Sequence, residues 1–145
     1  MRHDGNIATF GQVLDGTGEQ RLLIKFVESQ VPVPGTGMAY DFHSLVWESK
    51  QGDEWSEKLT ITRADFEKGA DRRRWISDIH SLDSTRGLAV VKVGEEQPRE
   101  ADGSMQVEYS WREWDLKNNR QLQLLRVCKS PFEDVDGKES PAKNQ

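Results

Sequence analysis

Apolar and polar residues alternate along most of the chain, and this alternation predicts β-strands. In an extended strand successive side chains point to opposite faces, so a period of two marks a sheet with one covered face. Clusters of Gly, Pro, Asp and Asn interrupt the alternating segments, as turns do. The pattern predicts eight strands, over residues 7–13, 21–27, 39–48, 55–61, 75–82, 88–94, 105–116 and 121–128.

Two of the connections carry specific turn or loop signals. Asp15-Gly16 and Asn118-Asn119 are residue pairs that accept the backbone angles of tight turns. Between the second and third predicted strands, two prolines and two glycines predict a loop, because proline lacks a backbone donor. These four residues are Pro32, Pro34, Gly35 and Gly37.

One short helix is expected after the fourth strand. Thr62 is a suitable N-cap, and Asp65, three residues later, completes a shortened capping box. Ile61 and Phe66 occupy the two positions of a hydrophobic staple. These signals predict a helix near residues 63–70, ending beside a run of arginines.

The fold class follows from these elements. Short connections favour antiparallel neighbours, and an open sheet must cover its apolar face. We therefore expect a mainly β fold, all-β or β-rich α+β, with about eight antiparallel strands in a compact barrel or sandwich. Residues 1–129 are expected to form one domain, and the polar residues 130–145 a largely disordered tail.

Composition and charge narrow the classes of partner. The 145-residue chain is 34% hydrophobic and 31% charged, and its formal net charge is −5. That acidic balance argues against a nucleic-acid partner, which requires a basic face. No apolar run approaches the length of a membrane span. The single cysteine, Cys128, cannot form an internal disulfide, so we expect a soluble cytoplasmic protein.

A repeated Asp-x-His pattern is the main candidate for chemistry. Asp41 and His43 lie on one predicted strand, and Asp78 and His80 on another. Residues two apart share a face of a strand, so each pair presents a carboxylate beside an imidazole. If the two strands faced each other, the four groups would form a site for a divalent metal or for acid–base catalysis.

The structural alternative for these residues is a solvent-facing position. Tyr40, Phe42 and Val46 form a more apolar face of the same strand, which would turn Asp41 and His43 outwards. A carboxylate beside an imidazole is also a common surface hydrogen bond. No strong catalytic motif accompanies the pattern, and no cofactor is expected apart from such a metal.

Exposed aromatic and basic residues are the second candidate. Trp111 and Trp114 fall on opposite faces of one predicted strand, so one ring is either exposed or buried on the far side. An exposed tryptophan is a good anchor for a protein partner. The arginine run Arg72, Arg73 and Arg74 could contact phosphate or an acidic partner. Core packing and a solvated helix end are the alternatives.

Two functional hypotheses remain open on the sequence alone. The first is a non-enzymatic binding or interaction domain for a protein or a small ligand, which the weakness of the catalytic motifs favours. The second is a small metal-dependent or acid–base enzyme that uses the paired Asp-x-His strands. A ligand domain needs a cavity, whereas a metal site needs its ligands gathered around one centre.

Overall fold

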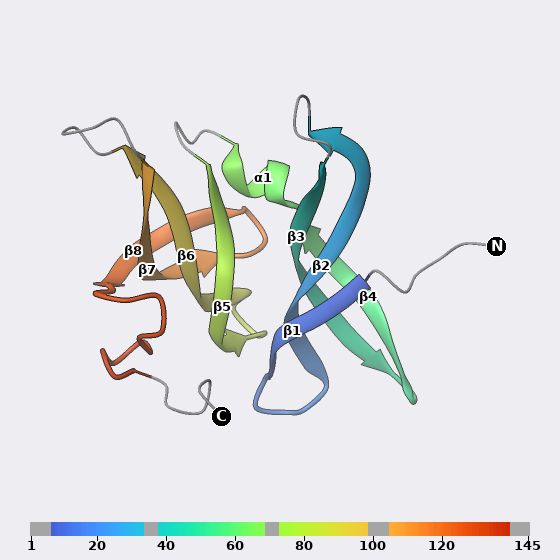
Figure 1. Ribbon diagram of the computed structural model, residues 1–145. Helices are drawn as coiled ribbons and strands as arrows, with labels where there is room; N and C mark the ends of the chain where they lie inside the picture. Colours follow the sequence, from blue (N-terminus) through green and yellow to red (C-terminus); the bar gives the residue numbers. More distant parts are fainter. Residues whose placement is uncertain (1–6, 34–37, 69–72, 99–104, 140–145) are drawn as a thin grey trace.

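The computed structural model describes residues 7–33, 38–68, 73–98 and 105–139, which form two antiparallel sheets and one short helix (Figure 1). Each sheet has four strands, in the orders β1-β2-β3-β4 and β5-β6-β7-β8. The elements are β1 (Ile7–Leu14), β2 (Gln20–Val33), β3 (Met38–Gln51), β4 (Glu54–Ile61), α1 (Arg63–Glu67), β5 (Arg74–Asp83), β6 (Leu88–Pro98), β7 (Met105–Asp115) and β8 (Arg120–Val127).

This architecture confirms the predicted fold class, a mainly β chain of eight antiparallel strands, and it is a sandwich of two sheets. Strand β2 continues beyond its predicted end at residue 27 to Val33, and β3 begins at Met38, so of the four residues expected in the loop Pro32 lies in a strand. The sheet accommodates Pro32 because the register shifts between Glu28 and Pro32. Residues 34–37 lie outside the described part of the chain.

The predicted turns and helix start are present. Asp15 Oδ1 accepts hydrogen bonds from the backbone of Thr17 and Gly18, as its turn position requires. Asn119 has a positive φ of 51°, in the region that asparagine tolerates. The capping box of Thr62 and Asp65 is complete.

The helix α1 is shorter than predicted. It ends at Glu67, with Lys68 as its C-cap, and has no basic residue in its last turn. Arg74 begins β5 instead of extending the helix, and its backbone N–H donates to Glu67 Oε2 at 3.1 Å. The residues between, 69–72, are outside the described ranges.

The core lies between the two sheets and is closed at one end by α1. Strand alternation sends one set of apolar side chains from each sheet into this layer. The Phe66 ring packs against Trp114, with 4.5 Å between the ring centroids. The buried cluster comprises Leu22, Ile24, Leu45, Trp47, Ile61, Phe66, Ile76, Ile79, Leu82, Ala89, Val91, Val93, Trp114 and Leu116.

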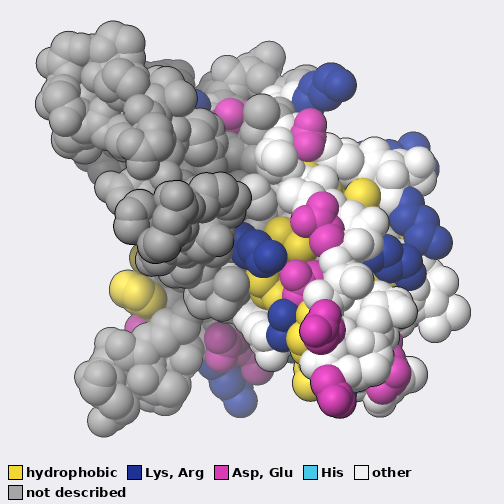
Figure 2. Space-filling model, turned by 90° about the vertical axis from the view of Figure 1, so that its right-hand side faces the viewer, with side chains coloured by type: hydrophobic (Ala, Val, Ile, Leu, Met, Phe, Trp, Pro, Cys, Tyr) yellow, Lys and Arg dark blue, Asp and Glu magenta, His cyan; other side chains and the backbone are white. Residues whose placement is uncertain are grey.

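Opposite charges are paired on the first sheet. Glu48 is buried, and its carboxylate lies 2.6 Å from Arg21 Nη2 and 3.3 Å from Lys25 Nζ. Figure 2, which views the right-hand side of Figure 1, shows basic and acidic side chains interspersed around small hydrophobic areas. Within the described residues, no helix has the length and apolar character needed to cross a membrane.

Residues 128–139 fold back against the second sheet (Figure 1, red). We call this segment the C-terminal strap. Lys92 Nζ donates to Pro131 O at 2.7 Å, and Trp111 Nε1 donates to Glu133 O at 3.0 Å. A bridge between Glu133 and Glu139 closes the segment on itself. The strap therefore differs from the disordered tail expected over residues 130–145, because buried donors on the sheet fix its carbonyl groups. Residues 140–145 are not described.

Candidate interaction surface

Strand β8 forms one edge of the second sheet, where its outer side has no neighbouring strand in the described sheet. All its residues except Arg126 are exposed. Four of them are large and apolar, and their exposed fractions are far above those of core residues. The four are Leu122 at 42%, Leu124 at 51%, Leu125 at 41% and Val127 at 48%.

The register with β7 explains why these side chains stay uncovered. Leu124 lies opposite Arg112, which in turn lies opposite the core residue Val91. Val127 lies opposite the buried Ser110. Cross-strand partners share a face of the sheet, so Leu124 and Val127 point to the core side. In Figure 1 the first sheet occupies the right half of the molecule, whereas β8 runs through the left half.

The register of β8 shifts twice, near Leu122 and near Leu125. As a result Gln121, opposite the core residue Trp114, joins Leu124 and Val127 on the core face at intervals of three residues. Gln123 and Arg126 lie opposite Glu113 and Trp111, on the other face. This arrangement leaves apolar groups along the whole length of the edge.

The opposite edge of the sandwich, β4, is protected in the usual way. Its exposed residues include Glu54, Glu57 and Lys58, and charges at an edge oppose pairing with another chain. The apolar residues Leu59 and Ile61 at its end are half-buried and buried. Strand β8 has no such protection along its middle, since residues 121–125 carry no charge.

Charged groups stand at the two ends of β8. The Arg120 side chain is 69% exposed, and its Nε lies 3.8 Å from Asp115 Oδ2. Arg126 donates to the carbonyl oxygens of Val135 and Asp136, at 3.3 and 3.4 Å. Arg126 therefore holds the acidic part of the C-terminal strap beside the end of β8.

Cys128 follows β8 and begins the strap. Its side chain is half-buried, and this burial raises the pKa of the thiol above its ordinary value. Lys92 and Arg126 lower that pKa, while Glu133 raises it. The thiol is therefore held in its protonated form at neutral pH, which makes it a poor nucleophile.

The structure places both candidate tryptophans in the interior, so neither can serve as the exposed anchor considered above. Trp111 is 2% and Trp114 1% exposed. Trp114 packs in the core between the sheets, and its Nε1 donates to Asn119 Oδ1 at 3.1 Å. Trp111 points to the other face and lies under the C-terminal strap. Both faces of β7 are thus covered, which explains why the strand carries a tryptophan on each face.

The arginine run separates into different environments. Arg73 is exposed, with Nη1 4.0 Å from Glu96. Arg74 is half-buried, and its guanidinium carbon lies 4.9 Å from the Phe66 ring centroid. Arg74 Nε donates to Phe66 O, so Arg74 supports α1. Arg72 lies outside the described residues.

The two Asp-x-His pairs belong to different sheets. Asp78 lies opposite Lys92, and its Oδ1 accepts a hydrogen bond from Ile79 N at 2.8 Å. His80 is exposed, with its ring 6.1 Å from Trp111. The backbone of Asp41 and His43 pairs within the first sheet, but their side chains are not described.

Within the described side chains, no group of three His, Cys, Asp or Glu residues is placed to hold a metal. The joint site of Asp41, His43, Asp78 and His80 therefore stays a prediction.

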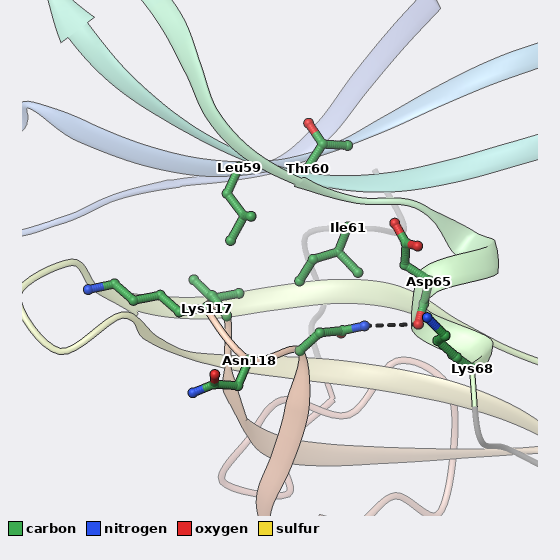
Figure 3. Close-up of a pocket in the computed structure, with 9 residues that line it drawn as sticks. Leu59, Thr60, Ile61, Asp65, Lys68, Lys117 and Asn118 are labelled. Carbon is green, nitrogen blue, oxygen red and sulfur yellow. Dashed lines mark hydrogen bonds between the residues drawn. The ribbon is translucent and has the colours of Figure 1, made fainter.

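A hollow of about 360 Å³ lies between the end of β4, α1 and the β7–β8 turn (Figure 3). Figure 3 shows Leu59 and Ile61 pointing from β4 toward the turn. Asn119 Nδ2 donates to Asp65 O at 2.9 Å, the dashed line of Figure 3. This bond ties the start of β8 to α1. The hollow is lined by Leu59, Thr60, Ile61, Asp65, Lys68, Leu116, Lys117, Asn118 and Asn119.

Comparison of the chain with protein-family models, with curated proteins and with solved structures finds no significant match.

The sequence did carry a signal for the β8 surface, although the predicted site residues did not include it. Residues 121–127, QLQLLRV, contain two adjacent leucines between polar neighbours, so apolar groups fall on both faces. A strand covered on one face alternates strictly. That departure distinguishes β8 from a strand that covers only one face.

Proposed function

We propose that this chain is a non-enzymatic protein-interaction domain and that the β8 edge is its binding element. The observation that supports this proposal is the set of four exposed aliphatic side chains, from Leu122 to Val127, on an edge strand that pairs with β7 on one side only. An added strand would satisfy the backbone N–H and C=O groups of the edge and cover these side chains.

The energetic argument uses the apolar groups. Full burial of one leucine or valine side chain stabilises a complex by roughly 1.5–3 kcal/mol. These four side chains are already about half-buried, so covering the remainder supplies part of the free energy that micromolar binding requires, about 8 kcal/mol. The polar hollow of Figure 3 offers fewer apolar contacts, so it supports a small ligand less well.

The test is a selection of displayed random peptides on the immobilised full chain. We expect selected peptides to bind the wild-type chain and to bind Leu124→Lys at least tenfold more weakly. Leu14→Lys is the matched control, because Leu14 of β1 is 52% exposed and Leu124 is 51% exposed. Both variants must keep the wild-type circular dichroism and urea midpoint. Peptides that bind all three chains equally well would place the binding site elsewhere and overturn the proposal.

A further inference from the structure

We infer that the strand completing the β8 edge is β8 of a second copy of this chain, paired antiparallel about a two-fold axis at Leu124. This inference rests on the proposed function and names its partner. A two-fold axis perpendicular to a sheet pairs a strand with itself in the antiparallel sense and keeps each residue on its own face. The edge must then match its own reversed copy.

The core-facing residues of β8 fulfil this condition. Gln121, Leu124 and Val127 are spaced symmetrically about Leu124, as a consequence of the two register shifts. With the axis at Leu124, this leucine meets its own copy, and Val127 lies opposite Gln121 of the second copy. All three pairs stay on the core face, and no cation meets a cation within residues 121–127.

The two neighbouring registers with the axis at Gln123 or at Leu122 are less favourable. An axis at Gln123 would set Arg120 directly opposite Arg126 of the other copy, and like charges directly opposite each other destabilise a strand pair. An axis at Leu122 would turn Leu124 toward Arg120. The register at Leu124 thus combines leucine contact with separation of the arginines.

Charge complementarity at the ends supports the same arrangement. Antiparallel pairing sets Arg120 opposite Cys128 of the second copy, where the C-terminal strap begins. The strap carries Asp134 and Asp136 as exposed carboxylates, held near the end of β8 by Arg126. Each copy therefore brings an exposed guanidinium toward acidic groups of the other, and the two-fold axis repeats this contact.

Pairing at β8 also limits the electrostatic repulsion between two acidic chains. Two chains that each carry a net charge of −5 repel at long range. Strand β8 has no carboxylate of its own between Arg120 and Val127. Two copies can therefore approach at the β8 edges without bringing carboxylates of the two strands together. The edge strand β4, in contrast, carries Glu54 and Glu57.

The experiment is sedimentation velocity of the full chain over a wide concentration range. We expect a species of twice the 16.6 kDa monomer mass. Leu124→Lys should weaken dimerisation at least tenfold, whereas Leu14→Lys should dimerise like the wild type. Leu122→Glu serves as a second edge variant in case Leu124→Lys folds poorly.

A charge exchange tests the register. Arg120→Asp should weaken the dimer at low salt, and adding Asp134→Arg to the same chain should restore much of the affinity. Equal affinity in all three chains at low salt would contradict the register with its axis at Leu124. A dimer that neither edge variant weakens would overturn the inferred interface altogether.

The outcomes also separate this inference from the proposed function. A chain that stays monomeric, yet whose selected peptides bind Leu124→Lys more weakly, keeps the interaction domain and overturns the second copy as its partner. A monomeric chain whose selected peptides ignore Leu124 overturns both.

Discussion

Lys92 Nζ donates a 2.7 Å hydrogen bond to the carbonyl oxygen of Pro131, 39 residues further along the chain. Lys92 is 2% exposed, and its ammonium lies 5.1 Å from the centroid of the Trp111 ring. The strap is therefore fastened to the sheet by a buried cation. This contact joins the middle of β6 to the segment that follows β8.

Lys92→Met should loosen the C-terminal strap. The substitution keeps an unbranched side chain, one heavy atom shorter than lysine, but leaves Pro131 O without its donor, at a cost of about 1–3 kcal/mol in the free energy of unfolding. Urea unfolding measures that cost, and hydrogen exchange should show faster exchange in residues 129–139. Lys58→Met is the matched control, because Lys58 also lies over a tryptophan, Trp47, but is exposed. Its effect should stay within about 0.5 kcal/mol.

Gly94→Ala should destabilise the second sheet. A Cβ atom at Gly94 would lie 2.7 Å from Cε2 of the Trp75 indole, which packs on the glycine from the neighbouring strand. The ring must move, and overpacking of this kind costs roughly 1–3 kcal/mol. Thermal unfolding checks the prediction. Gly16→Ala, where a Cβ meets no atom within 4 Å, should leave the midpoint almost unchanged.

Asp15 should make stability depend on pH in the acid range. Burial alone would raise the pKa of its carboxyl, but hydrogen bonds from Ser84, Thr17 and Gln20 hold it below the ordinary value of 3.8. Because the pKa is lower in the folded state, the ionised Asp15 stabilises the fold at pH values above 3.8. This stability is lost as the pH falls through the folded-state pKa. Urea unfolding between pH 2 and pH 6 should show a shallower acid loss for Asp15→Asn.

The control for this prediction is Asp53→Asn, in the exposed turn between β3 and β4. An acid profile that Asp15→Asn and Asp53→Asn change equally would contradict a specific role for the Asp15 contact. Ser84→Ala should reproduce part of the Asp15→Asn effect, because it removes one of the donors.

Cys128 should alkylate slowly. Burial raises its pKa, so the thiolate fraction at pH 8 is smaller than in the unfolded chain. The rate of reaction with iodoacetamide should rise only at a higher pH than in the urea-unfolded protein. Lys92→Met should shift the profile further upward, because the Lys92 charge opposes the rise. Identical pH profiles for the folded and unfolded chain would show that burial has no such effect.

The strands could be predicted because local chemistry determines them. Period-two alternation located all eight, and the cap of Thr62 and the asparagines at 118 and 119 located the helix start and a turn. The end of α1 and the length of β2 could not be predicted. Pairing with β3 extended β2 past Pro32, which lies opposite Ala39, although the prolines and glycines there gave a local loop signal.

The candidate sites depended even more on tertiary contacts. The positions of Trp111 and Trp114 suggested an exposed ring because the sequence does not reveal that the strap covers the outer face of β7. The same contact explains why polar residues after 128 are ordered: Lys92 and Trp111 supply donors from distant strands. Strand β8, by contrast, is apolar on both sides and could have been singled out from its two adjacent leucines.

The strand order means that contacts within a sheet are local in the sequence, whereas contacts between the sheets join distant residues. Within each sheet every described strand pairs with its sequence neighbours, so each sheet forms through short hairpin loops. The hydrogen bond between Ser84 and Asp15 spans 69 residues and joins turns of different sheets. Hairpins should therefore be present in the folding transition state before the sheets meet. Conservative substitutions at Ser84 should then accelerate unfolding and leave the refolding rate nearly unchanged.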